Sequence, residues 1–131
     1  MTQYDARNIS MMMDLYEMTM AHGYFKEDQE GDFATFDVFY RRNPDGGGFA
    51  IFAGLEQVLE YLENLHFDER DIEYLRSLKI YDEDFLRWLS GYRFRGDVIA
   101  MPEGSIMYPD EPILTATTRR SSSSARTRPR Y

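Results

Sequence analysis

Three residues near the start of the chain, Asp14, Tyr16 and Glu17, combine side chains that could do chemistry. Because Asp14 and Glu17 are three apart, a helix would present them on one face, where two carboxylates could act as an acid/base pair. Tyr16 between them could stack on a planar ligand. The same three residues could instead form the solvated edge of a buried helix. Residue type and spacing leave both interpretations open.

A second candidate group is Arg41-Arg42, which precedes the glycine run 46–48. Arginine supplies forked donors for an anion, and glycine lets a backbone approach a ligand closely. The spacing matches neither the P-loop nor the dinucleotide-binding fingerprint. The group is therefore interpreted either as an anion contact or as a flexible turn with solvated arginines.

Neither histidine has acidic neighbours at metal-ligand spacing, so no metal site is predicted. His66 is expected at a helix end, where an imidazole interacts favourably with the helix dipole. His22 is expected in an interface or a core. Two acid pairs are interpreted as first-turn helix charges without further function: Glu69 with Asp71, and Asp82 with Asp84.

Length and composition favour a globular chain with its own core. The chain has 131 residues, of which 43% are hydrophobic and 15% aromatic, too apolar for a disordered protein. The absence of cysteine excludes disulfides, thiolate zinc sites and cysteine nucleophiles. No apolar run approaches the roughly 20 residues that span a bilayer, and the N-terminus lacks a signal-peptide pattern. A cytoplasmic protein without a membrane partner is expected.

Charge is distributed unevenly along the chain. Five arginines and no acid lie in residues 115–131, so residues 1–114 carry a net charge of −13. Because a surface this acidic repels a polyphosphate backbone, no nucleic-acid partner is expected.

Hydrophobic periodicity predicts four helices, over residues 10–25, 54–65, 68–78 and 82–90. Ser10 is the expected N-cap of the first helix. This first helix has apolar residues around most of its circumference, which is typical of a helix buried on more than one side. It therefore needs two packing partners, and a chain this short could supply only one.

Strands are predicted over residues 33–40 and 94–101, with short extended pieces up to residue 108 and at 113–115. Residues 49–53 are interpreted either as a short strand or as the lead-in to the next helix. In the first strand, four alternate residues form the face expected to point toward the core: Ala34, Phe36, Val38 and Tyr40.

Residues 115–131 are rich in arginine and serine and are predicted to be a disordered tail. The tail could be a solvated basic segment that binds acids, or an out-of-frame or truncated end of a longer sequence. The predicted domain boundaries are therefore 1–114 for the domain and 115–131 for the tail.

Four stretches, taken together and in this order, resemble the nicotinate phosphoribosyltransferase family over about residues 8–114. They are DLYEMTMA at 14–21, FDVFYRRNP at 36–44, FAGLEQVLEYL at 52–62, and PEG at 102–104 with PDEPIL at 109–114. Two positions depart from the family pattern: Met13 replaces a usual threonine, and Asp45 replaces a usual apolar residue.

The resemblance implies an α+β fold, the N-terminal domain of a type II phosphoribosyltransferase without its C-terminal α/β barrel. The family joins nicotinate to phosphoribosyl pyrophosphate, giving nicotinate mononucleotide in NAD salvage, with ATP and Mg²⁺ and as a homodimer. The barrel carries the phosphate sites and the phosphorylated histidine, which neither His22 nor His66 matches. No catalytic residue or metal ligand is therefore expected here, and the 131-residue chain alone is expected to be inactive.

In the resemblance, Tyr16 reaches the nicotinate pocket of a partner subunit and stacks on the pyridine ring, with Asp14 beside it. Arg41 and Arg42 would lie near the mouth of the site as an anion contact. Two alternatives remain: a non-catalytic acidic interaction module, and a relative that acts on nicotinamide or quinolinate.

Overall fold

The structure, a computed structural model, describes residues 8–27 and 33–119. The chain forms two compact units, each assembled from two separate stretches. The helical unit contains Met1–Gln29 and Glu63–Arg93, and the sheet unit contains Glu30–Leu62 and Phe94–Tyr131. No helix in the described part of the chain is long and apolar enough to cross a membrane.

The helical unit is built from α1 (Leu15–Lys26), α3 (Glu69–Ser77) and α4 (Glu83–Ser90). The helices predicted at 68–78 and 82–90 are confirmed. Both begin at an aspartate whose carboxylate accepts backbone amides, because the first turn of a helix leaves these donors unpaired. Asp68 forms a capping box with Asp71, and Asp82 accepts the Phe85 amide at 2.9 Å.

One apolar cluster forms the core of the helical unit. Phe85 and Leu86 from α4 are fully buried, and Leu75 from α3 is 1% exposed. Aromatic rings continue the packing, with the Phe25 and Trp88 centroids 5.5 Å apart. The remaining buried members are Met18, Phe67, Ile72, Tyr81 and Leu89.

The predicted start of the first helix at Ser10 is wrong. The helix α1 begins at Leu15, and its N-cap is Asp14. Ser10 is only 2% exposed, and its hydroxyl oxygen accepts the His66 amide at 3.3 Å. The side chain expected to cap a helix instead holds the N-terminal segment against the chain that follows α2.

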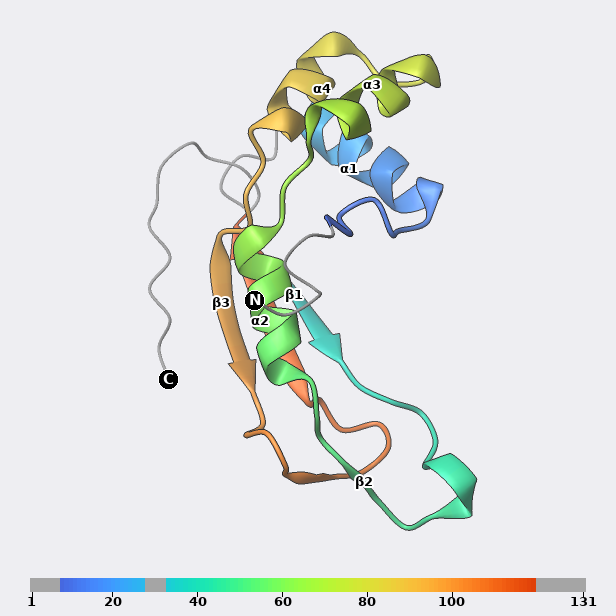
Figure 1. Cartoon of the computed structure of the whole chain (residues 1–131), viewed down its shortest axis with the longest axis vertical. Coiled ribbons are helices and arrows are strands. Elements are labelled where there is room, and N and C mark those ends of the chain that lie inside the picture. The colour runs from blue at the N-terminus through green and yellow to red at the C-terminus, as the bar shows by residue number, and fades with distance from the viewer. Residues whose placement is uncertain (1–7, 28–32, 120–131) are drawn as a thin grey trace. The chain divides into compact units, whose positions relative to one another are not determined.

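The sheet unit contains an antiparallel sheet of three strands in the order β1 (Phe33–Val38), β5 (Leu114–Arg119) and β3 (Gly96–Ala100). Helix α2 (Leu55–Asn64), which confirms the helix predicted at 54–65, lies over this sheet in Figure 1. Together with the helical unit, these elements confirm the predicted α+β class.

The predicted domain boundary after residue 114 falls inside β5, so residues 115–119 are not a tail. They form the central strand, which pairs with β1 on one side and β3 on the other. The partners lie far away in sequence, and the extended piece predicted at 113–115 marks only the start of a strand that is specified by long-range pairing. The rest of the predicted tail, residues 120–131, lies outside the described residues.

The predicted core-facing side of the first strand is only partly buried. Register places Phe36 beside Ala116 and Val38 beside Leu114 on the same face. Leu114 on the central strand is buried, whereas Phe36 is 63% and Val38 50% exposed. The prediction is wrong for these two side chains because β1 is an edge strand that the described elements leave uncovered.

A two-stranded ribbon extends the sheet unit. Strand β2 (Ala50–Ile51) pairs with β4 (Ile106–Met107), and the 3₁₀ turn η1 (Pro44–Gly46) precedes β2. We call residues 39–51 together with 106–110 the arm. At the base of the arm, the Glu103 carboxylate accepts the amides of Gly54 (2.7 Å) and Leu55 (2.9 Å) and thereby caps α2.

Candidate functional site

Asp14, Tyr16 and Glu17 lie together at the N-terminal end of α1, and all three side chains are exposed. Asp14 occupies the N-cap position with an extended backbone, yet its carboxylate makes no capping hydrogen bond. Tyr16, in the first turn, is 61% exposed. Asp14 and Glu17 border a shallow, open depression together with Met11, Met12 and Met13.

Helix α1 packs through one side and presents the other to its surroundings. Met18 is buried in the core of the helical unit, whereas Tyr16, Met20 and Tyr24 are exposed. These three follow one another at four-residue spacing, so they share one face of the helix. Gly23 lies on the same face, and a Cβ built on it would meet nothing within 4 Å. The sequence predicts that this helix has more apolar surface than one core can bury. The exposed face agrees with that prediction.

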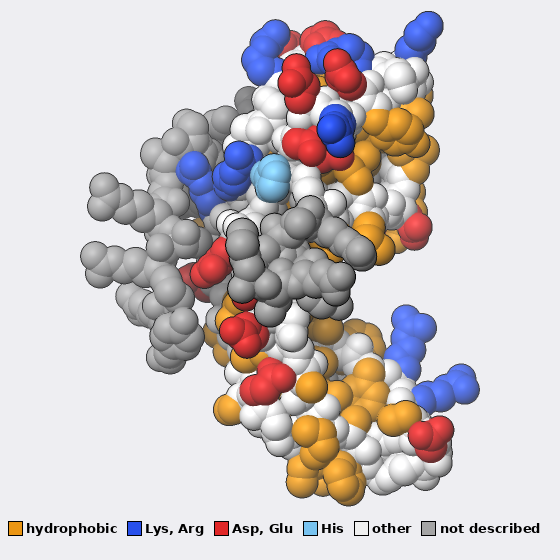
Figure 2. All heavy atoms as spheres, in the orientation of Figure 1, with side chains coloured by type: hydrophobic (Ala, Val, Ile, Leu, Met, Phe, Trp, Pro, Cys, Tyr) orange, Lys and Arg blue, Asp and Glu red, His pale blue; other side chains and the backbone are white. Residues whose placement is uncertain are grey.

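Arg41 and Arg42 follow β1 at the start of the arm, and both are exposed. Neither guanidinium has a hydrogen-bond or ion-pair partner within the described ranges. Figure 2 shows basic side chains projecting from this part of the surface beside a group of hydrophobic side chains. The exposed apolar residues of the arm are Phe39, Phe49, Ile51, Ile106 and Tyr108.

Tyr40 fixes the chain just before the two arginines. Its hydroxyl lies 2.8 Å from the Met107 carbonyl and 2.8 Å from Asn43 Oδ1, and both oxygens are acceptors for its proton. Its own carbonyl accepts the Asp110 amide at 2.8 Å. Desolvation by burial raises the pKa of the Tyr40 hydroxyl above its ordinary value.

His22 has a structural position inside the helical unit, as the prediction of a core or interface residue required. Its side chain is 17% exposed, and Nε2 lies 3.0 Å from Asp82 Oδ2. The Lys26 ammonium contacts the same oxygen. Hydrogen bonds from Lys26, His22 and the Phe85 amide lower the pKa of the Asp82 carboxyl far below its ordinary value. The α4 cap therefore also anchors α1.

His66 follows the end of α2, and its Nδ1 lies 2.6 Å from the Asn64 carbonyl. The expected helix-end position is confirmed.

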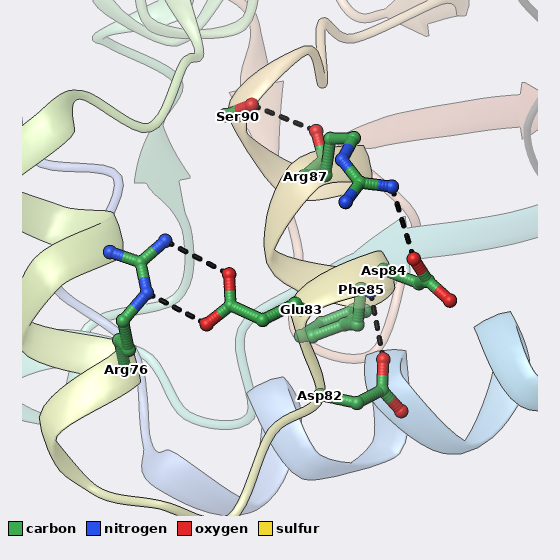
Figure 3. A network of polar contacts seen from close by, with 7 residues as sticks. All are labelled: Arg76, Asp82, Glu83, Asp84, Phe85, Arg87 and Ser90. Atoms are coloured by element: carbon green, nitrogen blue, oxygen red, sulfur yellow. Dashed lines mark hydrogen bonds and ion pairs between the residues drawn. The ribbon is translucent and has the colours of Figure 1, made fainter.

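Of the acids predicted as first-turn helix charges, Glu69, Asp71 and Asp84 are confirmed in that position, whereas Asp82 is the N-cap of α4. Figure 3 shows Asp82 at the N-cap of α4, with Glu83 paired to Arg76 and Asp84 paired to Arg87. The bidentate contact with Arg76 lowers the pKa of the Glu83 carboxyl. In the described residues, no three His, Asp or Glu side chains form a group that could hold a metal ion.

Sequence reasoning missed two residues that organise the sheet unit, Glu103 and Tyr40. Glu103 caps a helix that begins 48 positions earlier in the chain, and Tyr40 bonds to Met107, which lies 67 positions later. One sequence signal pointed to these segments: the stretches 36–44, 52–62 and 102–104 occur together and in a fixed order. This order indicated that they belong to one structure.

The two candidate groups belong to different units: Asp14 and Tyr16 to the helical unit, and Arg41 and Arg42 to the sheet unit. Within the helical unit, Tyr16 is suited to stack on a flat ligand. Within the sheet unit, the arginine pair is suited to bind an anion.

Comparison with solved structures defines the class of fold. Human nicotinic acid phosphoribosyltransferase superposes with a TM-score of 0.72 and 34% identity over 82% of this chain and 22% of the human chain. A nicotinate-nucleotide pyrophosphorylase from Pyrococcus furiosus shares the fold, with a TM-score of 0.58 at 18% identity over 91% of this chain and 24% of that chain. The chain therefore has the α+β fold of the matched part of human nicotinic acid phosphoribosyltransferase.

Sequence comparison defines the family more closely. Residues 11–122 match the model of the nicotinate phosphoribosyltransferase N-terminal domain. The chain is 48% identical over 105 residues to a nicotinate phosphoribosyltransferase of Mycobacterium tuberculosis and 40% identical over 107 residues to that of Bacillus subtilis. These alignments cover 80% and 82% of this chain, and the chain spans 22% of the length of either relative. The chain therefore belongs to the nicotinate phosphoribosyltransferase family.

Proposed function

We propose that this chain forms the N-terminal part of a nicotinate phosphoribosyltransferase of NAD salvage. The reaction joins nicotinate to phosphoribosyl pyrophosphate, gives nicotinate mononucleotide and pyrophosphate, and is coupled to ATP hydrolysis. The observation that carries the proposal is the family match over residues 11–122, within which Tyr16 lies exposed on α1.

In this reaction the pyridine nitrogen forms a bond to the anomeric carbon of the ribose while the bond to pyrophosphate breaks. Positive charge develops on the ribosyl centre, and negative charge develops on the leaving group. Catalysis of such a step depends mainly on positioning and on electrostatic stabilisation.

We assign Tyr16 the role of an aromatic platform for the pyridine ring, supplied to the site of a partner subunit in a homodimer. Its exposure and the open face around Gly23 leave room for a ligand or a second protein surface against α1. Asp14, exposed at the N-cap, would orient groups beside the ring.

We assign Arg41 and Arg42 the role of a contact to a phosphate group of the substrate. Their support is the absence of a partner in the described residues and the braced backbone that precedes them.

ATP and Mg²⁺ belong to the proposed reaction, but the described residues offer no grouped ligands for a metal ion. We therefore assign the metal to none of them. His22 and His66 are both engaged in structural contacts, so neither is assigned a phosphorylation role. The 131-residue chain by itself is proposed to be inactive, because its candidate residues lie on open surfaces that cannot exclude water from the reaction.

The proposal is tested by replacing the matching segment of the Mycobacterium tuberculosis relative with residues 11–119 of this chain, so that β5 is kept whole, and measuring nicotinate mononucleotide synthesis. Tyr16→Ala in this chimera should raise the KM for nicotinate about three- to tenfold. This range follows because an aromatic contact is worth about 0.5–1.5 kcal/mol beyond the area that it buries. Tyr16→Phe should retain most of the affinity, since the ring provides the stacking.

Tyr74→Ala is the matched control, because Tyr74 is similarly exposed but lies on α3. It should leave the KM for nicotinate unchanged. If Tyr16→Ala lowers the melting temperature and leaves that KM unchanged, Tyr16 is a packing residue and the assignment is wrong.

A further inference from the structure

The backbone that carries Arg41 and Arg42 is held from both sides. On one side, β1 ends at Val38, whose carbonyl accepts the Ile113 amide at 2.9 Å. On the other side, the η1 turn begins at Pro44, whose carbonyl accepts the Gly47 amide at 3.0 Å. The two arginines therefore lie on a short segment with fixed ends.

Within this segment, Tyr40 is the residue that connects the arginine turn to the opposite strand of the arm. The hydroxyl reaches Met107 on β4, and the same hydroxyl contacts Asn43 immediately after the arginines. Tyr40 and Asn43 are half-buried, whereas Arg41 and Arg42 between them are exposed. Two half-buried polar side chains that contact each other therefore flank the two exposed arginines in the sequence.

We propose that Tyr40 is a positioning residue whose hydroxyl, together with Asn43, presents the Arg41–Arg42 pair to the phosphate groups of a phosphorylated substrate. The inference rests on the anion contact proposed above for the two arginines. Without the hydroxyl, the turn loses its link to β4 and to Asn43. The backbone of the turn is then less ordered before binding. Binding an anion must therefore order both the turn and the two long arginine side chains, and this loss of conformational entropy lowers the affinity.

The experiment is a pyrophosphate titration of the whole 131-residue chain, followed by amide and guanidinium NMR signals of Arg41 and Arg42. Tyr40→Phe should weaken binding about two- to tenfold, the range expected for loss of one net hydrogen bond. It should also increase fast backbone motion at residues 41–43, measured by ¹⁵N relaxation. The double variant Arg41→Gln with Arg42→Gln should abolish binding.

Tyr74→Phe is the matched control, because it removes an exposed tyrosine hydroxyl from α3 and leaves the contacts of Tyr40 intact. Its pyrophosphate affinity should equal that of the unaltered chain, and the thermal midpoints of both Phe variants should be similar.

The outcomes distinguish failure of the positioning role of Tyr40 from failure of the anion contact of the two arginines. If Tyr40→Phe binds pyrophosphate as the unaltered chain does while the double arginine variant does not, the positioning role is wrong and the anion contact stands. If the double variant still binds, or if the unaltered chain shows no response at Arg41 and Arg42, the anion contact fails and the positioning role fails with it.

Discussion

The helical unit and the sheet unit place their apolar side chains differently. In the helical unit, the large side chains of α3 and α4 form a closed core around Phe85. In the sheet unit, Phe52 and Leu114 are the hydrophobic residues that are buried within the described ranges, whereas Phe36 and Ile99 on its strands are exposed. The helical unit can thus be stabilised by its own core, although one face of α1 stays exposed. The sheet unit buries few of its large apolar side chains and retains apolar surface of the kind that contacts other protein surfaces.

The largest expected effect distinguishes these two kinds of apolar residue. Phe85→Ala should lower the free energy of unfolding by about 3–5 kcal/mol, because it removes a fully buried ring and leaves a cavity. Phe36→Ala, at an exposed position of β1, should change it by no more than about 0.5 kcal/mol. Urea unfolding followed by circular dichroism measures both variants.

A loss of similar size in the two variants would contradict the contrast between the units. It would mean that Phe36 is covered in solution, for example by a second copy of the chain. Repeating the unfolding at several protein concentrations identifies that case, since the stability of an associated chain depends on concentration.

An intermediate effect is expected at the base of the arm. Glu103→Gln replaces a carboxylate that accepts two amides at the start of α2 with a neutral group that can accept only through one oxygen. The expected cost is about 1 kcal/mol, the usual size for loss of a helix N-cap. Glu56→Gln, in the first turn of the same helix, is the control and should cost only a few tenths of a kcal/mol.

Hydrogen exchange of α2 locates the effect of Glu103→Gln. Faster exchange confined to the first turn of α2 agrees with a cap. Uniformly faster exchange through β3 and β5 would show instead that Glu103 supports the whole sheet unit, and the interpretation as a cap would be wrong.

These residues also show what the sequence could reveal. Helices α2, α3 and α4 were predictable because each has one apolar stripe, and Asp68 and Asp82 are strong local start signals. The start of α1 was not, because Ser10 has the chemistry of a cap but forms a tertiary hydrogen bond to His66.

Strand β5 was predicted only in part, as an extended piece at 113–115, for a related reason. Its residues form a strand through pairing with β1 and β3, each far away in the chain, and no local pattern records those partners. The same limit applies to the candidate site. The exposure of Tyr16 could be inferred from the excess of apolar residues in one helix, whereas the Tyr40–Met107 contact depends on a strand pairing that the sequence does not display.

The smallest expected effect concerns the pH dependence of the helical unit. The pKa of Asp82 is lowered in the folded chain, so its carboxylate stabilises the fold at any pH above the ordinary value of 3.8. That stabilisation is lost progressively as the pH falls below this value toward the lower folded pKa. Asp82→Asn should therefore lower the melting temperature at pH 7, and the difference from the unaltered chain should shrink below about pH 4. The effect is modest because the Asp82 side chain is 35% exposed and water screens its contacts with Lys26 and His22.

Asp84→Asn is the control, since that carboxylate is 78% exposed and pairs with Arg87 on the surface of α4. Melting temperatures of the three proteins, measured between pH 2 and pH 8, test this pH dependence. A difference for Asp82→Asn that stays constant across this range would show that the carboxylate acts through its shape as a cap, without contributing through its charge.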